Sequence, residues 1–318
     1  WYAAMLNSKY LKCVAPRAIG DNLHESPFYL GGAFALGLSV AWAFWAGEGR
    51  TWQNVDRYNW PQLFQYLPVK DMAEAGGKDV KFLKDWIDHP DYDDYWKQRG
   101  YAPSEYYQEH ADVPTLYLGG WYDSYARNTP QSYMTLSKMK ESAQVLLMGP
   151  WTHGGWGVSY AGNIDFGNHS FINYNDLRLA WFDHFLKGQY TEVADWSPVK
   201  IFVMGVNRWH DENEWPLART QYTSFYLHSN GAANSLDGNG WLDNKVPKGE
   251  ETPDRYVYNP LDPVPSAGGA MLGKRSGIQL QNAIESRPDV LVYTTSPLSE
   301  PVNVTGPVRV ILLSLIHI

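Results

Sequence analysis

The sequence predicts an α/β protein that carries a helical insertion and is followed by a β-rich region. Two apolar runs ending in glycine, Val113 to Gly119 and Val145 to Gly149, flank a helical stretch from about Pro130 to Lys140. This order is typical of a βαβ unit. Helical stretches fill residues 23–110, and short apolar runs broken by Gly, Pro, Asn and Asp follow Trp196. A chain of 318 residues is long enough for several such units.

The N-terminal residues add one αβ step to this core. Trp1 to Asn7 has the pattern of a helix end, and Leu11 to Pro16 is a short apolar run typical of a buried strand. Cys13, which lies in this run, is the only cysteine, so an internal disulfide is excluded. We interpret it as a small buried residue rather than a reactive thiol. Residues 1–22 and 111–196 are therefore predicted to form one α/β core.

Residues 23–110 are predicted to form a helical cap. Helical stretches there are separated by Gly, Pro and Asn, and no alternating strand pattern is visible. The longest apolar stretch, Leu30 to Ala46, is interrupted by Gly31, Gly32 and Gly37 and is too short for a spanning helix. We therefore expect no membrane segment.

A helix is expected to close the α/β core between Asn173 and Gly188. Leu177, Trp181 and Phe185 fall at i, i+4 and i+8, which places them on one helix face. Asn173 is a suitable N-cap and Gly188 a suitable C-terminal stop.

The region from residue 197 to residue 318 is predicted to be an antiparallel β-sandwich that packs on the α/β core. Its apolar runs are short and are separated by turn residues, as in all-β domains. The runs are Val199 to Met204, Thr223 to His228, Val290 to Thr294 and Val302 to Val310.

Composition favours a small-molecule partner. The 26 Lys and Arg residues are outnumbered by 34 Asp and Glu residues, giving a net charge of −8, and no basic run is present. Nucleic-acid binding is therefore disfavoured. Aromatic residues make up 15% of the chain and can supply both core and pocket walls. We expect no cofactor.

Two polar residues follow the central strands at their carboxyl ends. Asp123 ends the segment Gly119 to Asp123, and His153 lies in the Gly-rich segment Gly149 to Gly155. Because reactive side chains of α/β sheets lie just beyond the carboxyl ends of strands, both are expected at the same edge. In serine hydrolases of this architecture the carboxylate precedes the histidine, and the serine precedes both. Each residue alone is more often structural, and together they leave a catalytic role and a structural role equally open.

Several segments resemble the cocaine esterase/NonD (CocE/NonD) hydrolase family of the Xaa-Pro dipeptidyl-peptidase (S15) superfamily. Gly-Gly-Trp-Tyr-Asp at 119–123 and Gly-Pro-Trp-Thr-His at 149–153 are similar to the family's acid and base segments, including their spacing of thirty positions. Further similar segments are Leu11 to Pro16, Phe202 to Gly205 with Trp209, Glu214 to Pro216, Asp262 to Gly269, and Arg287 to Leu291. The resemblance covers nearly the whole chain.

The resemblance implies a partial α/β-hydrolase core, a helical cap over residues 23–110, and an incomplete galactose-binding-like jelly-roll over residues 197–318. It also implies a serine hydrolase in which Asp123 is the triad acid and His153 the general base. Esters, amides and N-terminal Xaa-Pro dipeptides all remain open as substrates. Tyr125 is expected to face the acyl or leaving-group pocket, although core packing is the commoner role of an aromatic residue after a strand.

The family's nucleophile lies in a Gly-x-Ser-x-x-Gly segment that would end a few residues before Trp1, and a tyrosine of its oxyanion hole lies further upstream. At the other end, Leu313 to Ile318 resembles translated sequencing-adapter DNA, with a genuine buried strand as the alternative. We therefore expect a fragment cut at both ends and inactive by itself.

Other interpretations remain open. The acidic segment His89 to Trp96 is either a solvated helix start or an attractor for a substrate ammonium group. A non-catalytic protein that binds carbohydrate through its β-sandwich is a competing function. A metal-dependent hydrolase using His153, His169 and Asp165 is a third. However, His169 and His184, with Asp165 and Asp183, lack metal-ligand spacing, so structural roles are expected.

Overall fold

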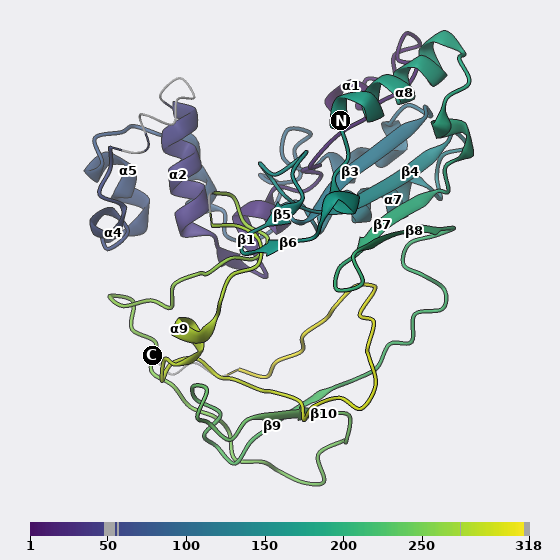
Figure 1. Ribbon diagram of the computed structural model, residues 1–318. Helices are drawn as coiled ribbons and strands as arrows, with labels where there is room; N and C mark the ends of the chain where they lie inside the picture. Colours follow the sequence, from purple (N-terminus) through teal and green to yellow (C-terminus); the bar gives the residue numbers. More distant parts are fainter. Residues whose placement is uncertain (48–54, 56, 274, 315–318) are drawn as a thin grey trace.

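The centre of the molecule is a four-stranded sheet in the computed structural model, which describes residues 1–47, 55, 57–273 and 275–314. Its strands, in spatial order, are β3 (Thr115–Tyr122), β4 (Gln144–Thr152), β7 (Val199–Val203) and β8 (Arg208–Glu212). The first three are parallel, and β8 pairs antiparallel with β7. The carboxyl ends of three neighbouring strands therefore meet at one edge (Figure 1).

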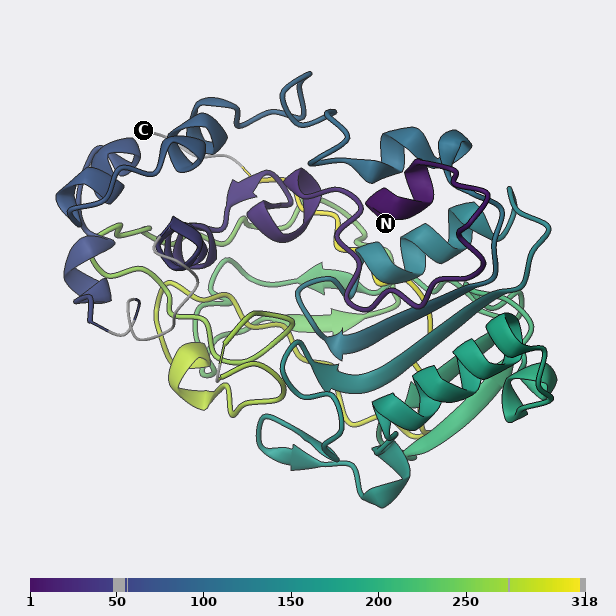
Figure 2. The ribbon, with the colours of Figure 1, turned by 90° about the horizontal axis from the view of Figure 1, so that it is seen from above.

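Two helices cover the two faces of the sheet, as Figure 2 shows. Helix α7 (Asn128–Leu136) packs Tyr133 and Leu136 against one face, and α8 (Tyr174–Lys187) packs Leu177 and Trp181 against the other. Strand residues alternate between the two apolar cores: Tyr117, Leu146 and Met148 lie on the α7 side, and Leu116, Leu118 and Leu147 on the α8 side. Burial on both faces explains why these strands are continuous apolar runs.

The predicted closing helix and its caps are confirmed. The side chain of Asn173 accepts a hydrogen bond from the backbone N–H of Asn175, at 3.1 Å, as an N-cap should. Gly188 ends α8 in the left-handed conformation, with φ +66°, which costs glycine no steric strain.

The N-terminal segment lies beside β3. After the short helix α1 (Tyr2–Met5), Val14 and Arg17 form parallel bridges with Thr115 and Leu118. The predicted strand therefore contacts the sheet through isolated bridges on the free side of β3.

The predicted cap is mainly helical in the described residues and has an aromatic core, with Phe44 and Trp96 fully buried. One short hairpin, β1 (Tyr29–Leu30) with β2 (Ala33–Phe34), was not predicted, because two-residue strands leave no alternating pattern. The cap helices are η1 (His24–Phe28), α2 (Leu36–Gly47), α4 (Trp60–Leu63), η2 (Val69–Asp71), α5 (Met72–Ala75), α6 (Lys81–Asp88) and η3 (Pro103–Glu109). Across the residues that the structure describes, none of the helices has both the length and the apolar character to cross a membrane.

One expected sandwich strand belongs to the central sheet instead. The run Val199 to Met204 was assigned to the β-sandwich, but β7 hydrogen-bonds to β4, and Val199 and Ile201 are at most 1% exposed. A buried sheet strand and a sandwich strand have the same local apolar pattern, so sequence alone does not separate them. The chain then returns along β8 before it leaves the sheet.

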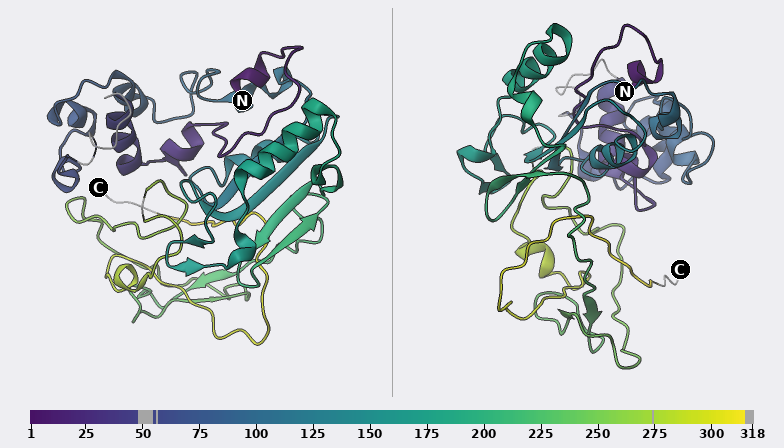
Figure 3. Two further views of the ribbon diagram at one scale, coloured as in Figure 1. Left: turned by 45° about the horizontal axis from the view of Figure 1, so that its top comes forward. Right: turned by 90° about the vertical axis from the view of Figure 1, so that its right-hand side faces the viewer.

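The region after Glu212 lies below the sheet and the cap (Figure 3). Its described elements are the antiparallel pair β9 (Tyr226–His228) and β10 (Trp241–Asp243), and the helix α9 (Asn282–Glu285). Isolated bridges join Asn234 to Leu291 and Trp241 to Thr294. Between Val302 and Val310 no strand is present, and this topology does not show a jelly-roll. Within the adapter-like segment, residues 315–318 lie outside the described residues.

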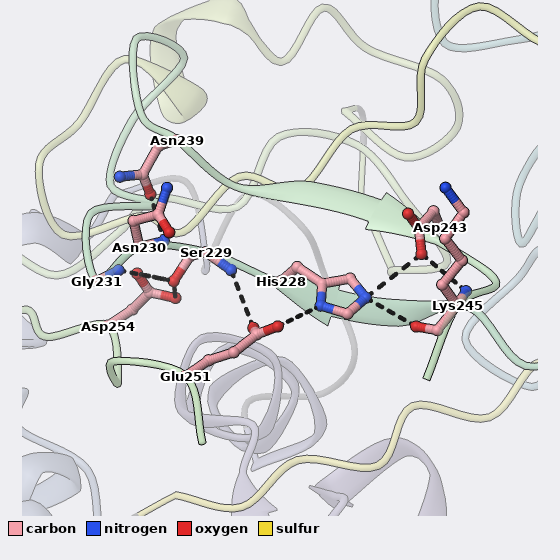
Figure 4. A network of polar contacts seen from close by, with 9 residues as sticks. All are labelled: His228, Ser229, Asn230, Gly231, Asn239, Asp243, Lys245, Glu251 and Asp254. Carbon is pink, nitrogen blue, oxygen red and sulfur yellow. Dashed lines mark hydrogen bonds and ion pairs between the residues drawn. The ribbon is translucent and has the colours of Figure 1, made fainter. Parts of the chain in front are cut away.

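A polar network organises β9 and the loop that follows β10 (Figure 4). The Nδ1 atom of His228 lies 2.6 Å from Oε1 of Glu251, and its Nε2 atom lies 3.0 Å from the carbonyl oxygen of Lys245. The ring stacks on Trp241 at 5.1 Å between centroids. Asp254 accepts hydrogen bonds from Ser229. This network holds the loop by side-chain contacts rather than by a sheet.

Candidate active site

Asp123 and His153 lie at neighbouring strand ends, as the sequence predicts. Asp123 directly follows β3, and His153 directly follows β4. The two strands approach closely at this edge because Gly120 has no side chain: a Cβ atom there would collide with the carbonyl oxygen of Trp151. The pairing register also shifts between Gly120 and Tyr122, an irregularity that redirects the residues beyond it.

The two side chains are in contact, which confirms the predicted juxtaposition. The Nδ1 atom of His153 lies 3.1 Å from Oδ2 and 3.2 Å from Oδ1 of Asp123. The Asp123 side chain is 1% exposed, whereas that of His153 is 43% exposed. The carboxylate is thus shielded, while the imidazole remains open to a reacting molecule.

Backbone and side-chain groups fix the Asp123 carboxylate. Its Oδ1 atom accepts a hydrogen bond from the backbone N–H of Tyr125 at 2.9 Å and one from the hydroxyl of Ser124 at 3.4 Å. The backbone of Ala126 donates to the Asp123 carbonyl oxygen. A carboxylate held in this way can orient a histidine ring.

This arrangement suits acid–base chemistry. When Nδ1–H of His153 donates to Asp123, the lone pair of Nε2 is left to accept a proton. The carboxylate also stabilises the imidazolium that forms after the transfer. Asp123 and His153 together can therefore serve as the orienting acid and the base of a nucleophilic mechanism.

Tyr125 stands beside this pair. Its ring centroid lies 5.7 Å from that of His153, at an interplanar angle of 47°. Burial, followed by the nearby negative charge of Asp123, raises the pKa of Tyr125 to about 12. The hydroxyl is therefore neutral near pH 7.

We refer to residues 123–127, which join β3 to α7, as the acid loop. Tyr125 in this loop also lines a cavity of about 240 Å³ between the cap, the acid loop and the C-terminal region. The other lining residues are Leu23, Pro27, Phe28, Leu38, Trp42, Trp86, Gly100, Tyr101 and Leu272. Sequence reasoning identified Tyr125 but missed Leu272, because no local pattern signals a contact with a segment so distant in the chain. The many aromatic residues of the cap were the sequence feature that pointed to the other walls of the cavity.

A second group that sequence reasoning missed is the buried carboxylate of Asp21, which is 2% exposed. It accepts hydrogen bonds from the hydroxyls of Tyr107 and Ser132 and from the amide of Asn128. Burial raises its pKa, although these donors oppose the shift. Asp21, just before the cap, is thus bonded to the end of the cap and to α7, which begins just after the acid loop.

The other histidines and carboxylates that were considered make local contacts. His184 Nδ1 lies 3.0 Å from the carbonyl oxygen of Gln189, and Asp183 pairs with Lys187. Asp165 accepts from the backbone N–H of Gly167. These side chains and His169, which is exposed, join no group of three or more His, Cys, Asp or Glu suited to a metal, and the rest of the described chain has none.

The acidic cap segment is also engaged locally. Asp93 lies 2.6 Å from Nδ1 of His89 and accepts a hydrogen bond from the backbone N–H of Tyr95. Asp94 lies 3.5 Å from the ammonium of Lys97 and is exposed. The segment forms turns between α6 and η3, so the predicted helix start is wrong, and the carboxylates of Asp93 and Asp94 have local partners.

Two family profiles match the chain. The first 155 residues match the X-Pro dipeptidyl-peptidase (S15 family) profile. Residues 191–313 match the X-Pro dipeptidyl-peptidase C-terminal non-catalytic domain. Asp123 and His153 lie in the first region, and β7, β8, β9 and β10 lie in the second.

Individual hydrolases are also similar to this chain in sequence or in fold. The chain is 33% identical to cocaine esterase from Rhodococcus sp., over 97% of this chain and 56% of that protein. It is 29% identical to a putative serine esterase from Mycobacterium bovis, over 66% of this chain and 32% of the relative. The crystal structure of an aminopeptidase from a marine sediment archaeon superposes with a TM-score of 0.74 at 24% identity, covering 94% of this chain and 50% of that one, which shows a shared fold. The chain thus spans about half the length of these proteins or less.

Proposed function

Because this chain belongs to the cocaine esterase/NonD hydrolases of the X-Pro dipeptidyl-peptidase (S15) superfamily, we propose that it supplies the acid and base of a serine-dependent acyl hydrolase. Asp123 is the acid and His153 the general base. The nucleophile is a serine outside these 318 residues. The observation that carries this proposal is the contact between Nδ1 of His153 and the buried carboxylate of Asp123.

The reaction proceeds through an acyl-enzyme. Nε2 of His153 takes the proton of the serine hydroxyl while the serine oxygen attacks the substrate carbonyl carbon. The proton then passes from Nε2 to the departing alcohol or amine as its bond to the carbonyl carbon breaks. In the second half, His153 takes a proton from water, the resulting hydroxide attacks the acyl-enzyme, and the serine leaves with that proton.

The cavity beside Tyr125 is the proposed site of the acyl group. Its walls are aromatic and aliphatic, and the described residues that line it include no ionised side chain at neutral pH. A charged ammonium group would lose its hydration there without gaining an ionic partner. We therefore propose esters and amides with a neutral, apolar acyl group as substrates, in preference to peptides with a free N-terminus in this cavity.

The proposed domain organisation follows the family. Residues 23–110 form the cap, and residues 1–22 and 111–196 belong to a partial α/β-hydrolase core whose sheet also includes β7 and β8. The remaining C-terminal residues are part of a jelly-roll. The match to the non-catalytic C-terminal domain supports this last assignment.

Hydrolysis of p-nitrophenyl acetate and p-nitrophenyl benzoate by the complete gene product tests the function. We expect turnover and labelling by a fluorophosphonate, and we expect His153→Ala to lower kcat by several orders of magnitude, as triad deletions do. The matched control is His169→Ala. This variant removes another exposed histidine and should leave kcat unchanged.

Three outcomes contradict the proposal. Equal rates for the wild type and the His153→Ala protein remove His153 from the reaction. Loss of activity in His169→Ala together with inhibition by a chelator indicates a metal-dependent hydrolase. Carbohydrate binding without hydrolysis or labelling indicates a binding protein.

A further inference from the structure

One wall of the acyl cavity comes from the C-terminal region. Leu272 lines the cavity together with Tyr125 and cap residues, although it belongs to the chain beyond β10. In Figure 1 this part of the chain, between β10 and α9, rises toward β1 and α2. We refer to residues 262–273 as the Leu272 loop. Its position fixes the size of the cavity on that side.

The end of the loop near the cavity is tied to the segment that follows His153. Gly269 and Gly277 exchange backbone hydrogen bonds of 2.7 and 3.0 Å. Ile278 then donates to the carbonyl oxygen of Ala161, and its own carbonyl oxygen accepts from Asn163 at 2.7 Å. Ala161 and Asn163 belong to the hairpin of β5 (Tyr160–Ala161) and β6 (Ile164–Asp165).

The other end of the loop is held from α9. Arg287, just beyond the end of this helix, donates to the backbone carbonyl oxygen of Asp262 at 2.8 Å and to its carboxylate at 3.2 Å. Gln281, at the beginning of α9, donates to the carbonyl oxygen of Ala267 at 2.8 Å. Residues on either side of one short helix therefore hold two positions of the loop.

The guanidinium of Arg287 is pre-oriented for this contact. It makes two hydrogen bonds with Asp289, from Nε at 2.8 Å and from Nη2 at 2.7 Å, and the Asp289 side chain is only 12% exposed. The Asp262 carboxylate is 70% exposed, so its ionic contact contributes little, and the backbone carbonyl is the important acceptor. Donating to Asp289 and Asp262 at the same time requires the several N–H groups of a planar guanidinium, which lysine lacks.

Prolines and backbone hydrogen bonds restrain the loop between Asp262 and Leu272. Pro263 and Pro265 fix two backbone φ angles between Asp262 and Ala267. Gly268 and Gly269 follow the prolines, and the two backbone hydrogen bonds between Gly269 and Gly277 restrain this stretch before Leu272.

We propose that Arg287 is a positioning residue for substrate selection. It sets the place of Leu272 in the cavity wall through the Asp262 carbonyl, without touching the substrate. This inference rests on the proposed function, since it assigns the acyl group to the cavity. Arg287 thereby makes the C-terminal region part of the specificity of the enzyme.

The test measures kcat/KM of the complete gene product for p-nitrophenyl benzoate and p-nitrophenyl acetate. We expect Arg287→Gln to lower the benzoate-to-acetate ratio by about tenfold, because one apolar wall is loosened. Acetate hydrolysis should be unchanged. Arg287→Lys, which lacks the fork, should restore little of the ratio. The matched control, Arg219→Gln, removes another arginine that forms two hydrogen bonds with one carboxylate, that of Glu212, and should leave the ratio unchanged.

Hydrogen exchange supplies a readout that does not depend on activity. In Arg287→Gln, the amides of Gly269 and Gly277 should exchange faster than in the wild type. If Arg287→Gln does not fold, Gln281→Ala, which changes an exposed side chain, should produce both effects in weaker form.

The outcomes distinguish a failure of the positioning role of Arg287 from a failure of the proposed hydrolase function. An unchanged ratio together with unchanged exchange in a folded Arg287→Gln protein overturns the positioning role alone. A wild-type enzyme that hydrolyses no ester contradicts the proposed function, while the exchange measurement still reports whether Arg287 holds the loop.

Discussion

The hydroxyl of Ser26 donates a 2.7 Å hydrogen bond to the carbonyl oxygen of Ser124, the residue that follows the proposed catalytic acid. Ser26 is 1% exposed and lies in η1, at the beginning of the cap. This contact therefore ties the cap directly to the acid loop.

Removing the Ser26 hydroxyl should lower the stability of the folded protein. We expect Ser26→Ala to lower the free energy of unfolding by about 1 kcal/mol, because the Ser124 carbonyl oxygen loses a buried donor. Ser39→Ala is the matched control: Ser39 is also fully buried, but its hydroxyl has no hydrogen-bond partner in the described structure. Urea denaturation of both variants checks this, and equal losses would contradict the role of the Ser26 contact.

Removing the negative charge of Asp123 should lower the pKa of the neighbouring Tyr125 hydroxyl. Burial and the charge of Asp123 together raise the pKa of Tyr125 to about 12. In Asp123→Asn we expect this pKa to fall but to stay above the ordinary value of 10.0, because burial, the larger cause, remains. Tyrosine-labelled ¹³C NMR titration measures it, with Asp112→Asn as the control. A pKa that stays at the wild-type value would show that the carboxylate does not act on Tyr125.

The same substitution should impair catalysis. Asn at position 123 keeps the shape of the side chain but no longer favours the tautomer of His153 that has Nε2 free. Triad acids replaced in this way lose about 10⁴-fold in kcat. We expect a loss of that order in ester hydrolysis by the complete gene product. A loss of less than about tenfold would argue against Asp123 as the orienting acid.

The buried carboxylate of Asp21 should make stability depend on pH. Because burial raises its pKa above 3.8, the folded protein holds this proton more tightly than the unfolded chain does. The resulting stabilisation is complete below pH 3.8 and declines as the pH rises through the folded pKa. Asp21→Asn lacks this titration, so the stability of the wild type relative to Asp21→Asn should fall with rising pH.

Chemical denaturation of the two proteins from acid to neutral pH measures this difference. Asp94→Asn, which changes a fully exposed carboxylate, is the control for the loss of one acidic side chain. A wild-type advantage over Asp21→Asn that grows with pH would reverse the expected direction and contradict a raised pKa.

Gly162 should be essential for the contact between the β5–β6 hairpin and Ile278. Its φ is +64°, and an added Cβ would collide with the carbonyl oxygen of Ile278. Gly188→Ala provides the control, because Gly188 has φ +66° but nothing within 4 Å of an added Cβ. We expect Gly188→Ala to cost about 1–2 kcal/mol from backbone strain alone. Gly162→Ala should cost more and should speed hydrogen exchange at Ile278. Equal costs would mean that this contact contributes nothing.

The local sequence predicted the parts of the site that depend on strand order. Asp123 and His153 were found because parallel neighbouring strands bring their carboxyl ends together, whatever the rest of the chain does. The caps of α8 were found for a similar reason, since Asn173 and Gly188 act on adjacent backbone groups.

The parts that depend on distant contacts were not predicted. Leu272 and Asp21 have no local pattern that marks them, because their partners lie elsewhere in the chain. The run beginning at Val199 has the same apolar pattern in a parallel sheet as in a sandwich, and only its pairing with β4 decides between them. Sequence periodicity reports burial and not the identity of the neighbour.

The hydrogen bonds of Ile278 with Ala161 and Asn163 join residues that are synthesised far apart in time. Since chains emerge from the ribosome N-terminus first, Asp123 and His153 can pair before the Leu272 loop exists. Contacts between such distant residues also form slowly, because a long stretch of chain must be closed first. In a nascent chain, the cavity beside Tyr125 would therefore lack the wall that Leu272 supplies. The proposed selection among acyl groups would therefore depend on contacts that form after Asp123 and His153 have been synthesised.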